Sequence, residues 1–172
     1  MTVKRTSHNG GFERLKIAID DLDNMKLQVG WFEGLSYDSK TPVAAVAAQN
    51  EFGNPLKNIP PRPFMRPTIS NNEGDWKKLF KSASLDILAG NETADTVLDK
   101  MGQLVSGQVR ASIIAVKTPP LSPVTIKQRL RIRADKKTIG LLTKPLVFEG
   151  ILLNSTSYIV NNGDVQSPYG GG

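Results

Sequence analysis

Proline limits the fold of this chain most strongly in the stretch EFGNPLKNIPPRPFMRP, residues 51–67, which contains five of its eleven prolines. Each proline holds φ near about −65°, removes a backbone N–H donor and pushes the residue before it toward an extended conformation. We therefore predict an extended, polyproline-like strap over residues 54–69, and neither a helix nor a central strand. A segment that is stiff before it docks loses less entropy on binding.

The strap also carries side chains that are suited to binding. Phe64 and Met65 would each contribute roughly 1.5–3 kcal/mol if fully buried. Arg62 and Arg66, four residues apart, can each form a bidentate pair with a carboxylate. The residues alone leave open whether the strap packs on its own subunit or grips a neighbouring one.

The rest of the chain predicts one α+β domain over residues 1–172, with a small antiparallel sheet, two or three long helices and several long loops. Apolar spacing and turn signals predict helices at 12–25, 42–53, 70–90, 93–115 and about 123–131, and strands at 26–32 and 154–162. Residues 34–41 and 132–142 read as loops. Residues 1–11 and 163–172 are expected to be flexible tails.

Little in the sequence favours catalysis. His8 is the only histidine, cysteine is absent, and no phosphate-binding, dinucleotide-binding or hydrolase motif occurs. Asp20, Asp21 and Asp23 lack the spacing of a calcium loop. We therefore expect no enzymatic activity, no catalytic or metal-binding residues and no cofactor. No apolar run is long enough for a membrane span or a secretory signal, so we expect no membrane partner and assembly in the cytoplasm.

Positive charge is concentrated in one region, which we call the basic segment, residues 117–144. It holds eight Lys and Arg residues against one acid, whereas the whole chain carries a formal charge of +6. Such a segment can be a solvated helix face, an interface for an acidic protein, or a site for the phosphate backbone of DNA. It has no interleaved aromatic residues, which disfavours base stacking. The candidate contact residues are Lys127, Arg129, Arg131, Arg133, Lys136 and Lys137.

Three motifs together resemble one known family. AQNEFGNPLKNIPPRPFMRPTI (48–69), PPLSPVTIKQR (119–129) and KPLVFEGILLNSTSYIV (144–160) are similar, in this order, to segments of the neck and tail-completion proteins of tailed bacteriophages, also called virion morphogenesis or minor tail proteins. Phe148-Glu149-Gly150 stands where the family usually has Asp-Thr-Gly before its last short helix. Residues 132–142 are also longer than expected.

The resemblance implies a structural protein of the virion, without catalysis, that forms a ring of six or twelve identical copies at the head–tail junction. Its partners would be the connector or adaptor proteins, the tail tube protein and genomic DNA in the lumen. Because a closed ring needs two complementary faces on each subunit, the strap suits one of them. The expected subunit contacts are Glu51, Phe52, Arg62, Pro63, Phe64, Met65 and Arg66. The alternative function is a small basic protein that binds the DNA backbone through the basic segment.

Overall fold

The computed structural model describes residues 9–37, 40–136 and 142–162. These residues form a mixed helix and strand structure, which confirms the α+β class. In chain order the elements are α1 (Asn9–Asn24), β1 (Met25–Gly30), β2 (Ser36–Tyr37), β3 (Thr41–Pro42), α2 (Val43–Phe52), the 3-10 helix η1 (Pro55–Lys57), α3 (Met65–Leu88), α4 (Ala94–Ala115), α5 (Pro123–Lys136), α6 (Ile151–Asn154) and β4 (Ser157–Asn162).

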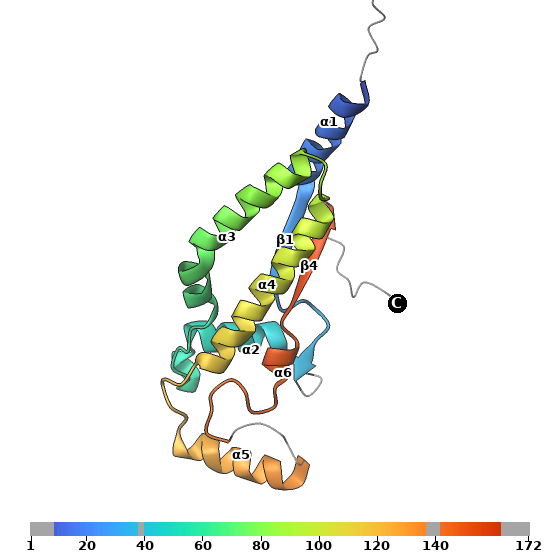
Figure 1. Cartoon of the computed structure of the whole chain (residues 1–172). Coiled ribbons are helices and arrows are strands. Elements are labelled where there is room, and N and C mark those ends of the chain that lie inside the picture. Colours follow the sequence, from blue (N-terminus) through green and yellow to red (C-terminus); the bar gives the residue numbers. More distant parts are fainter. Residues whose placement is uncertain (1–8, 38–39, 137–141, 163–172) are drawn as a thin grey trace, which may run out of the picture.

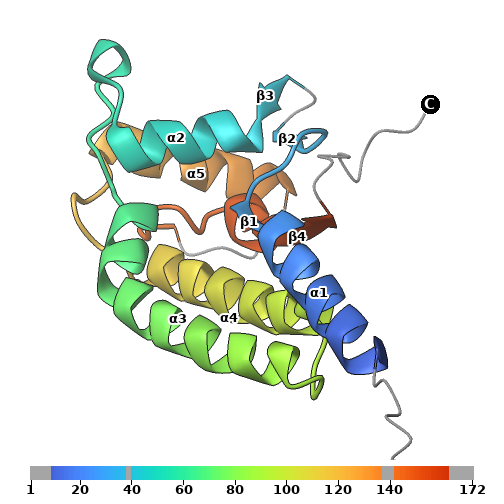
Figure 2. The same cartoon turned by 90° about the horizontal axis from the view of Figure 1, so that it is seen from above.

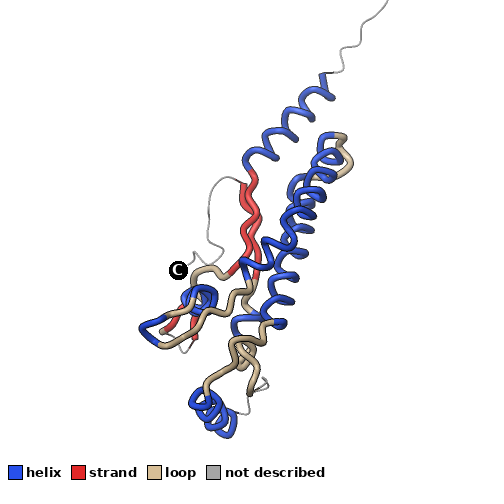
Figure 3. The backbone as a smooth tube through the Cα atoms, turned by 90° about the vertical axis from the view of Figure 1, so that its left-hand side faces the viewer, coloured by secondary structure: helices blue, strands red, loops and turns tan. Residues whose placement is uncertain are grey.

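The antiparallel helices α3 and α4 give the molecule its elongated shape, with α1 at one end and α5 at the other (Figure 1). β1 and β4 pair antiparallel, from Met25 opposite Asn162 to Gly30 opposite Ser157, and both strands lie along α4 (Figure 3). β2 and β3 form a second, very short pair. Helix α6 lies between α2 and α4 and contacts both (Figure 2).

Two hydrophobic clusters form the core, and α4 contributes to both. The upper cluster contains Ile87, Ala94, Val97 and Met101, and the side chains of Ala18 and Leu22 of α1 pack against it. The lower cluster contains Val43, Ala47, Phe64, Val109, Ile113 and Leu152, from four different parts of the chain. The strap and the two short helices α2 and α6 are therefore held together by the lower cluster.

Close packing explains one of the two glycines inside α4. A Cβ added at Gly102 would lie 2.2 Å from Cδ2 of Tyr158 in β4, so only glycine lets the strand come this near to the helix. At Gly107 the same addition would meet nothing within 4 Å. The Tyr158 hydroxyl then donates to Asp99 at 2.5 Å, which fixes the ring across α4.

The prediction of an extended strap over 54–69 is wrong for much of its length. Residues 55–57 form η1, Asn54 bridges to Ile59, and α3 begins at Met65 instead of residue 70. Pro67 is compatible with α3 because it lies in the first turn, where a backbone N–H has no partner within the helix. Residues 60–63 have no regular structure, and Asn58 and Phe64 lie in a turn and a bend.

The other predicted elements are close to those observed. β1 begins at Met25. Helix α2 has Pro42 as its N-cap residue and Gly53, with φ 77°, as its C-cap residue. Helix α5 extends to Lys136, beyond the expected residue 131, and the strand expected over 154–162 begins only at Ser157 because α6 ends at Asn154. The loop at 34–41 contains the β2 and β3 pair. Residues 9–11 belong to α1, whereas 1–8 and 163–172, including His8, lie outside the described residues.

Within the described parts of the chain, no helix combines the length and the apolar character needed to cross a membrane.

Candidate functional site

The carboxylate of Glu51, at the end of α2, caps the first turn of α3. One carboxylate oxygen accepts hydrogen bonds from the backbone N–H groups of Phe64 and Met65, at 2.8 and 2.9 Å. The other accepts from the backbone N–H and from Nε of Arg66, at 3.0 and 2.9 Å. Arg66 also donates through Nη2 to the backbone oxygen of Glu51 at 2.9 Å. We call this arrangement the Glu51 cap.

The cap solves a problem that the proline-rich sequence creates. The first turn of a helix has free N–H groups and the positive end of the helix dipole, both of which favour a carboxylate. The N-cap residue of α3 is Phe64, whose side chain makes no capping hydrogen bond. Glu51, thirteen residues earlier, supplies the acceptor instead and thereby fixes the angle between α2 and α3.

The Glu51 carboxylate stays ionised in this setting. Burial acts to raise its pKa, but the backbone hydrogen bonds from Phe64, Met65 and Arg66 and the side-chain bond from Arg66 outweigh it, so the pKa lies below its ordinary value. Glu51 is only 5% exposed. A buried carboxylate with four hydrogen bonds is a structural anchor, and its charge is matched within its own chain by Arg66.

Arg62 connects the proline-rich residues to the second motif. Its backbone N–H donates to the oxygen of Asn50 at 2.6 Å. Its side chain is buried and donates from Nε to the Pro119 oxygen at 2.8 Å and from Nη2 to the Pro120 oxygen at 3.0 Å. The first and second motifs are therefore in direct contact, although nearly 60 residues separate Arg62 from its acceptors.

Phe64 and Arg129 bring the third motif to the same region. Phe64 is 1% exposed and meets Trp31 edge-to-face with ring centroids 5.5 Å apart, while Trp31 Nε1 donates to the Leu152 oxygen at 2.8 Å. The guanidinium of Arg129 lies over the ring of Phe148, 4.8 Å from its centroid. All three motifs of the resemblance therefore meet around the lower cluster.

The outer side of the Glu51 cap presents apolar surface. Phe52 is 66% exposed, and the Arg66 guanidinium covers its ring at 5.0 Å from the centroid. Beside them a recess of about 240 Å³, which we call the apolar recess, is lined by Trp31, Ala44, Ala48, Phe52, Met65 and Arg66, among others. Its walls are mostly hydrocarbon, so it suits an apolar side chain from another molecule.

The predicted interface residues thus divide into two groups. Glu51, Arg62 and Phe64 are buried and have partners in their own chain, so their side chains offer no surface to a neighbour. The remaining four lie at or near the surface: Phe52, Pro63 and Arg66 are exposed and Met65 is half-buried. Arg62 binds the carbonyl oxygens of Pro119 and Pro120 in its own chain, and not an acidic group of an adjoining subunit. Arg66 pairs with Glu51 of its own chain.

The basic segment does not act as one uniform surface. Ser122 caps α5 by accepting from the Thr125 N–H at 3.2 Å. Lys127 and Arg131 are exposed on this helix, but Arg129 turns toward residues 142–148. Arg133 and Lys136 lie within α5, and Lys137 lies outside the described residues.

Sequence reasoning missed Trp31 and the carbonyl groups of Pro119 and Pro120. Trp31 had a signal, since it lies inside the alternating strand predicted over residues 26–32, but the strand pattern did not say what its ring would meet. Backbone carbonyls carry no sequence signal. No group of three or more His, Asp or Glu residues that could hold a metal ion occurs in the described ranges.

Comparison with models of protein families, with curated proteins and with solved structures finds no match to this chain.

Proposed function

We propose that this protein is a structural subunit of a ring at the head–tail junction of a tailed bacteriophage, where it completes the tail or joins it to the connector. The observation that carries the proposal is the meeting of the three resembling motifs. Glu51, Arg62 and Phe64 hold these motifs together from inside, and the same arrangement leaves Phe52 and the apolar recess open on the outside.

The amount of exposed apolar surface also supports assembly. Among the described residues, fifteen large apolar side chains are exposed and twelve apolar residues are buried. Single exposed apolar residues are ordinary, but a contiguous group on one element usually marks a contact with a partner.

Helix α1 carries such a group. Phe12, Leu15 and Ile19 follow the same helical spacing as Leu22, which packs against the upper cluster. Their exposed fractions are 70%, 40% and 51%. The apolar stripe of α1 thus continues beyond the residues that pack on the upper cluster, along a helix that extends past the ends of α3 and α4 (Figure 1). The apolar recess and this stripe give the subunit two different faces, which a head-to-tail ring requires.

Native mass spectrometry together with negative-stain electron microscopy tests the proposal. The expected result is a closed ring of identical subunits, formed alone or on the connector or tail tube. Phe52→Ser should weaken assembly at least about tenfold, because it removes a large apolar contact at the recess. Leu104→Ser, which removes an exposed apolar side chain of α4 outside the recess, should assemble as the wild type does.

A protein that stays monomeric at all concentrations and does not join connector or tail tube would contradict the proposal. Equal assembly of both serine variants would instead show that the contact between subunits lies outside the apolar recess. Circular dichroism of each variant excludes unfolding as the cause, since both side chains are exposed.

A further inference from the structure

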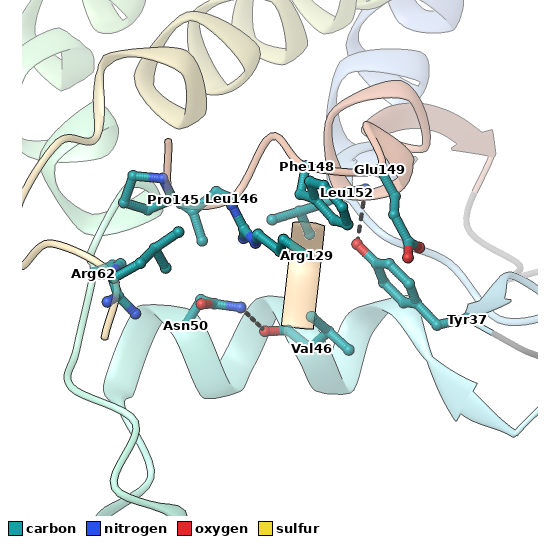
Figure 4. Close-up of a pocket in the computed structure, with 11 residues that line it drawn as sticks. Tyr37, Val46, Asn50, Arg62, Arg129, Pro145, Leu146, Phe148, Glu149 and Leu152 are labelled. Atoms are coloured by element: carbon teal, nitrogen blue, oxygen red, sulfur yellow. Dashed lines mark hydrogen bonds between the residues drawn. The ribbon is translucent and has the colours of Figure 1, made fainter. Parts of the chain in front are cut away.

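A second, polar cavity lies between α2, α5 and residues 142–152, next to the meeting point of the three motifs (Figure 4). Its volume is about 230 Å³, and its lining includes Tyr37, Asn50, Arg62, Arg129, Phe148 and Glu149. Arg62 follows α2 in the chain and Arg129 belongs to α5, and Figure 4 shows both side chains at the cavity. Two guanidinium groups from distant parts of the sequence therefore line one small cavity.

Arg62 uses only part of its donor capacity. A guanidinium has five N–H donors. Two nitrogen atoms of Arg62, Nε and Nη2, donate one hydrogen bond each to the carbonyl oxygens of Pro119 and Pro120. Its Nη1 has no acceptor among the described residues. Carbonyl oxygens carry no net charge, so they do not neutralise the positive charge of this buried side chain.

One edge of the Arg129 guanidinium has no acceptor in the part of the chain that the structure describes. Both of its hydrogen bonds leave from Nη1, to the oxygens of Leu142 at 3.2 Å and of Lys144 at 2.7 Å. The Phe148 ring covers one face of the group and holds its plane. Within the described residues, Nε and Nη2 make no hydrogen bond. These two parallel donors form the edge that a carboxylate engages with both of its oxygens.

The two positive charges are close enough to affect each other. The pKa of Arg129 is lowered, first by burial and then by the charge of Arg62, while Glu149 acts in the opposite direction. No carboxylate among the described residues forms an ion pair with Arg62 or Arg129 within 4.0 Å. Glu149 lines the cavity but is exposed, so it compensates only part of the charge.

We propose that this cavity binds a carboxylate group, held by the free Nε and Nη2 edge of Arg129 and by the unused donors of Arg62. A carboxylate would supply the missing counter-ion and would fill the one bidentate edge left open. The phosphates of duplex DNA are a poorer fit, because the side chain of Arg62 is buried.

The carboxylate has two sources, a free organic acid or an Asp or Glu side chain of another protein chain, such as the neighbouring subunit of a ring. The inference concerns the cavity and does not require the ring. Its failure would leave the apolar recess and the assembly test unaffected.

Titration of the purified protein with sodium acetate and sodium succinate, at ionic strength held constant with sodium chloride and followed by NMR shifts of the Arg Nε–H groups, tests the proposal. We expect saturable binding that Arg129→Gln weakens at least tenfold. Glu149→Gln should bind about five- to tenfold more tightly, because it removes a nearby like charge. Lys127→Gln, which removes an exposed charge on the same helix, should bind as the wild type does.

Arg129 also holds the carbonyls of Leu142 and Lys144, so Arg129→Lys provides a variant that keeps the charge and loses the bidentate edge. It should still bind more weakly than the wild type. Non-saturable shifts in both the wild type and Glu149→Gln would overturn the proposal, as would equal binding by the Lys and Gln variants and the wild type. Sulfate binding as tight as succinate binding would also overturn it, because it would show no preference for a carboxylate.

Addition of succinate to the assembled protein distinguishes the two sources. Dissociation of the assembly at succinate concentrations that saturate the cavity would identify a carboxylate of a neighbouring chain. Saturation of the cavity in an intact assembly would identify a free organic acid. Both results require the occupied cavity that we propose.

Discussion

At the scale of single residues, Glu51 is the side chain on which the local structure depends most. Glu51→Ala leaves three backbone N–H groups and Nε of Arg66 without their acceptor. We expect the free energy of unfolding to fall by about 3 kcal/mol, since breaking one side of a buried charged network leaves the other side unsatisfied. Urea denaturation measures the change.

Glu51→Gln should lose less, because its amide oxygen still accepts hydrogen bonds. Glu73→Gln is the matched control, since the ion pair of Glu73 with Lys77 lies on the exposed face of α3. It should change the stability little. If Glu51→Ala were as stable as this control, the Glu51 cap would not be the element that holds α2 and α3 together.

The pH dependence of stability provides a second test of Glu51. Its pKa in the folded protein lies below its unfolded value of about 4.3, so its ionised form stabilises the fold. This contribution is fully present above about pH 5 and is lost as the pH falls through the folded pKa. We expect the free energy of unfolding of the wild type to decrease more steeply between about pH 5 and pH 3 than that of Glu51→Gln. Parallel curves for the two proteins would contradict the assignment.

The residues of the site were predictable, but their partners were not. Composition alone identified Arg62, Phe64 and Arg66 as side chains that bind something. Arg66 pairs with a carboxylate, as expected. Arg62 instead donates to backbone oxygens, and because every residue has one, the sequence does not indicate which of them it will bind. Proline-rich stiffness is equally compatible with docking onto the same chain and onto another, so periodicity could not choose between them.

At the scale of elements, the contact between α4 and β4 depends on one glycine. Gly102→Ala improves helix propensity by up to about 1 kcal/mol but puts a methyl group into the Tyr158 ring. Because overpacking costs about 1–3 kcal/mol, we expect a net loss of stability. Gly107→Ala, in the same helix and facing open space, should instead stabilise by up to about 1 kcal/mol. Thermal unfolding of the two variants measures the contrast.

Equal stabilisation by both alanines would show that the Tyr158 ring can move aside at no cost. The same pair shows what sequence can say about elements. A glycine inside a predicted helix does not tell whether another element packs closely against it. The position of β4 is what makes Gly102 a close contact and leaves Gly107 facing open space. The start of α3 was misplaced for a related reason, since the cap that permits a helix through Pro67 comes from Glu51 in another helix.

At the scale of the whole molecule, the sequence predicted the class and the long helices but not their arrangement. β1 and β4 come from opposite ends of the chain, and an alternating apolar pattern does not specify which strand pairs with which. The apolar spacing of α1 was read correctly as an amphipathic helix. It could not indicate that only Ala18 and Leu22 reach the upper cluster while Phe12, Leu15 and Ile19 remain exposed.

That exposed stripe of α1 leads to the last prediction, which concerns assembly. If α1 packs on a neighbouring subunit, its amides near Phe12 and Leu15 should exchange with solvent more slowly in the assembled protein than in the monomer. Amides near Val109 and Ile113 of α4, which are already in the lower cluster, should exchange at the same rate in both states. Hydrogen exchange with mass spectrometry, before and after assembly, measures both segments in one experiment. Unchanged exchange in α1 would exclude it as the second face of the ring and leave the apolar recess to pair with another surface.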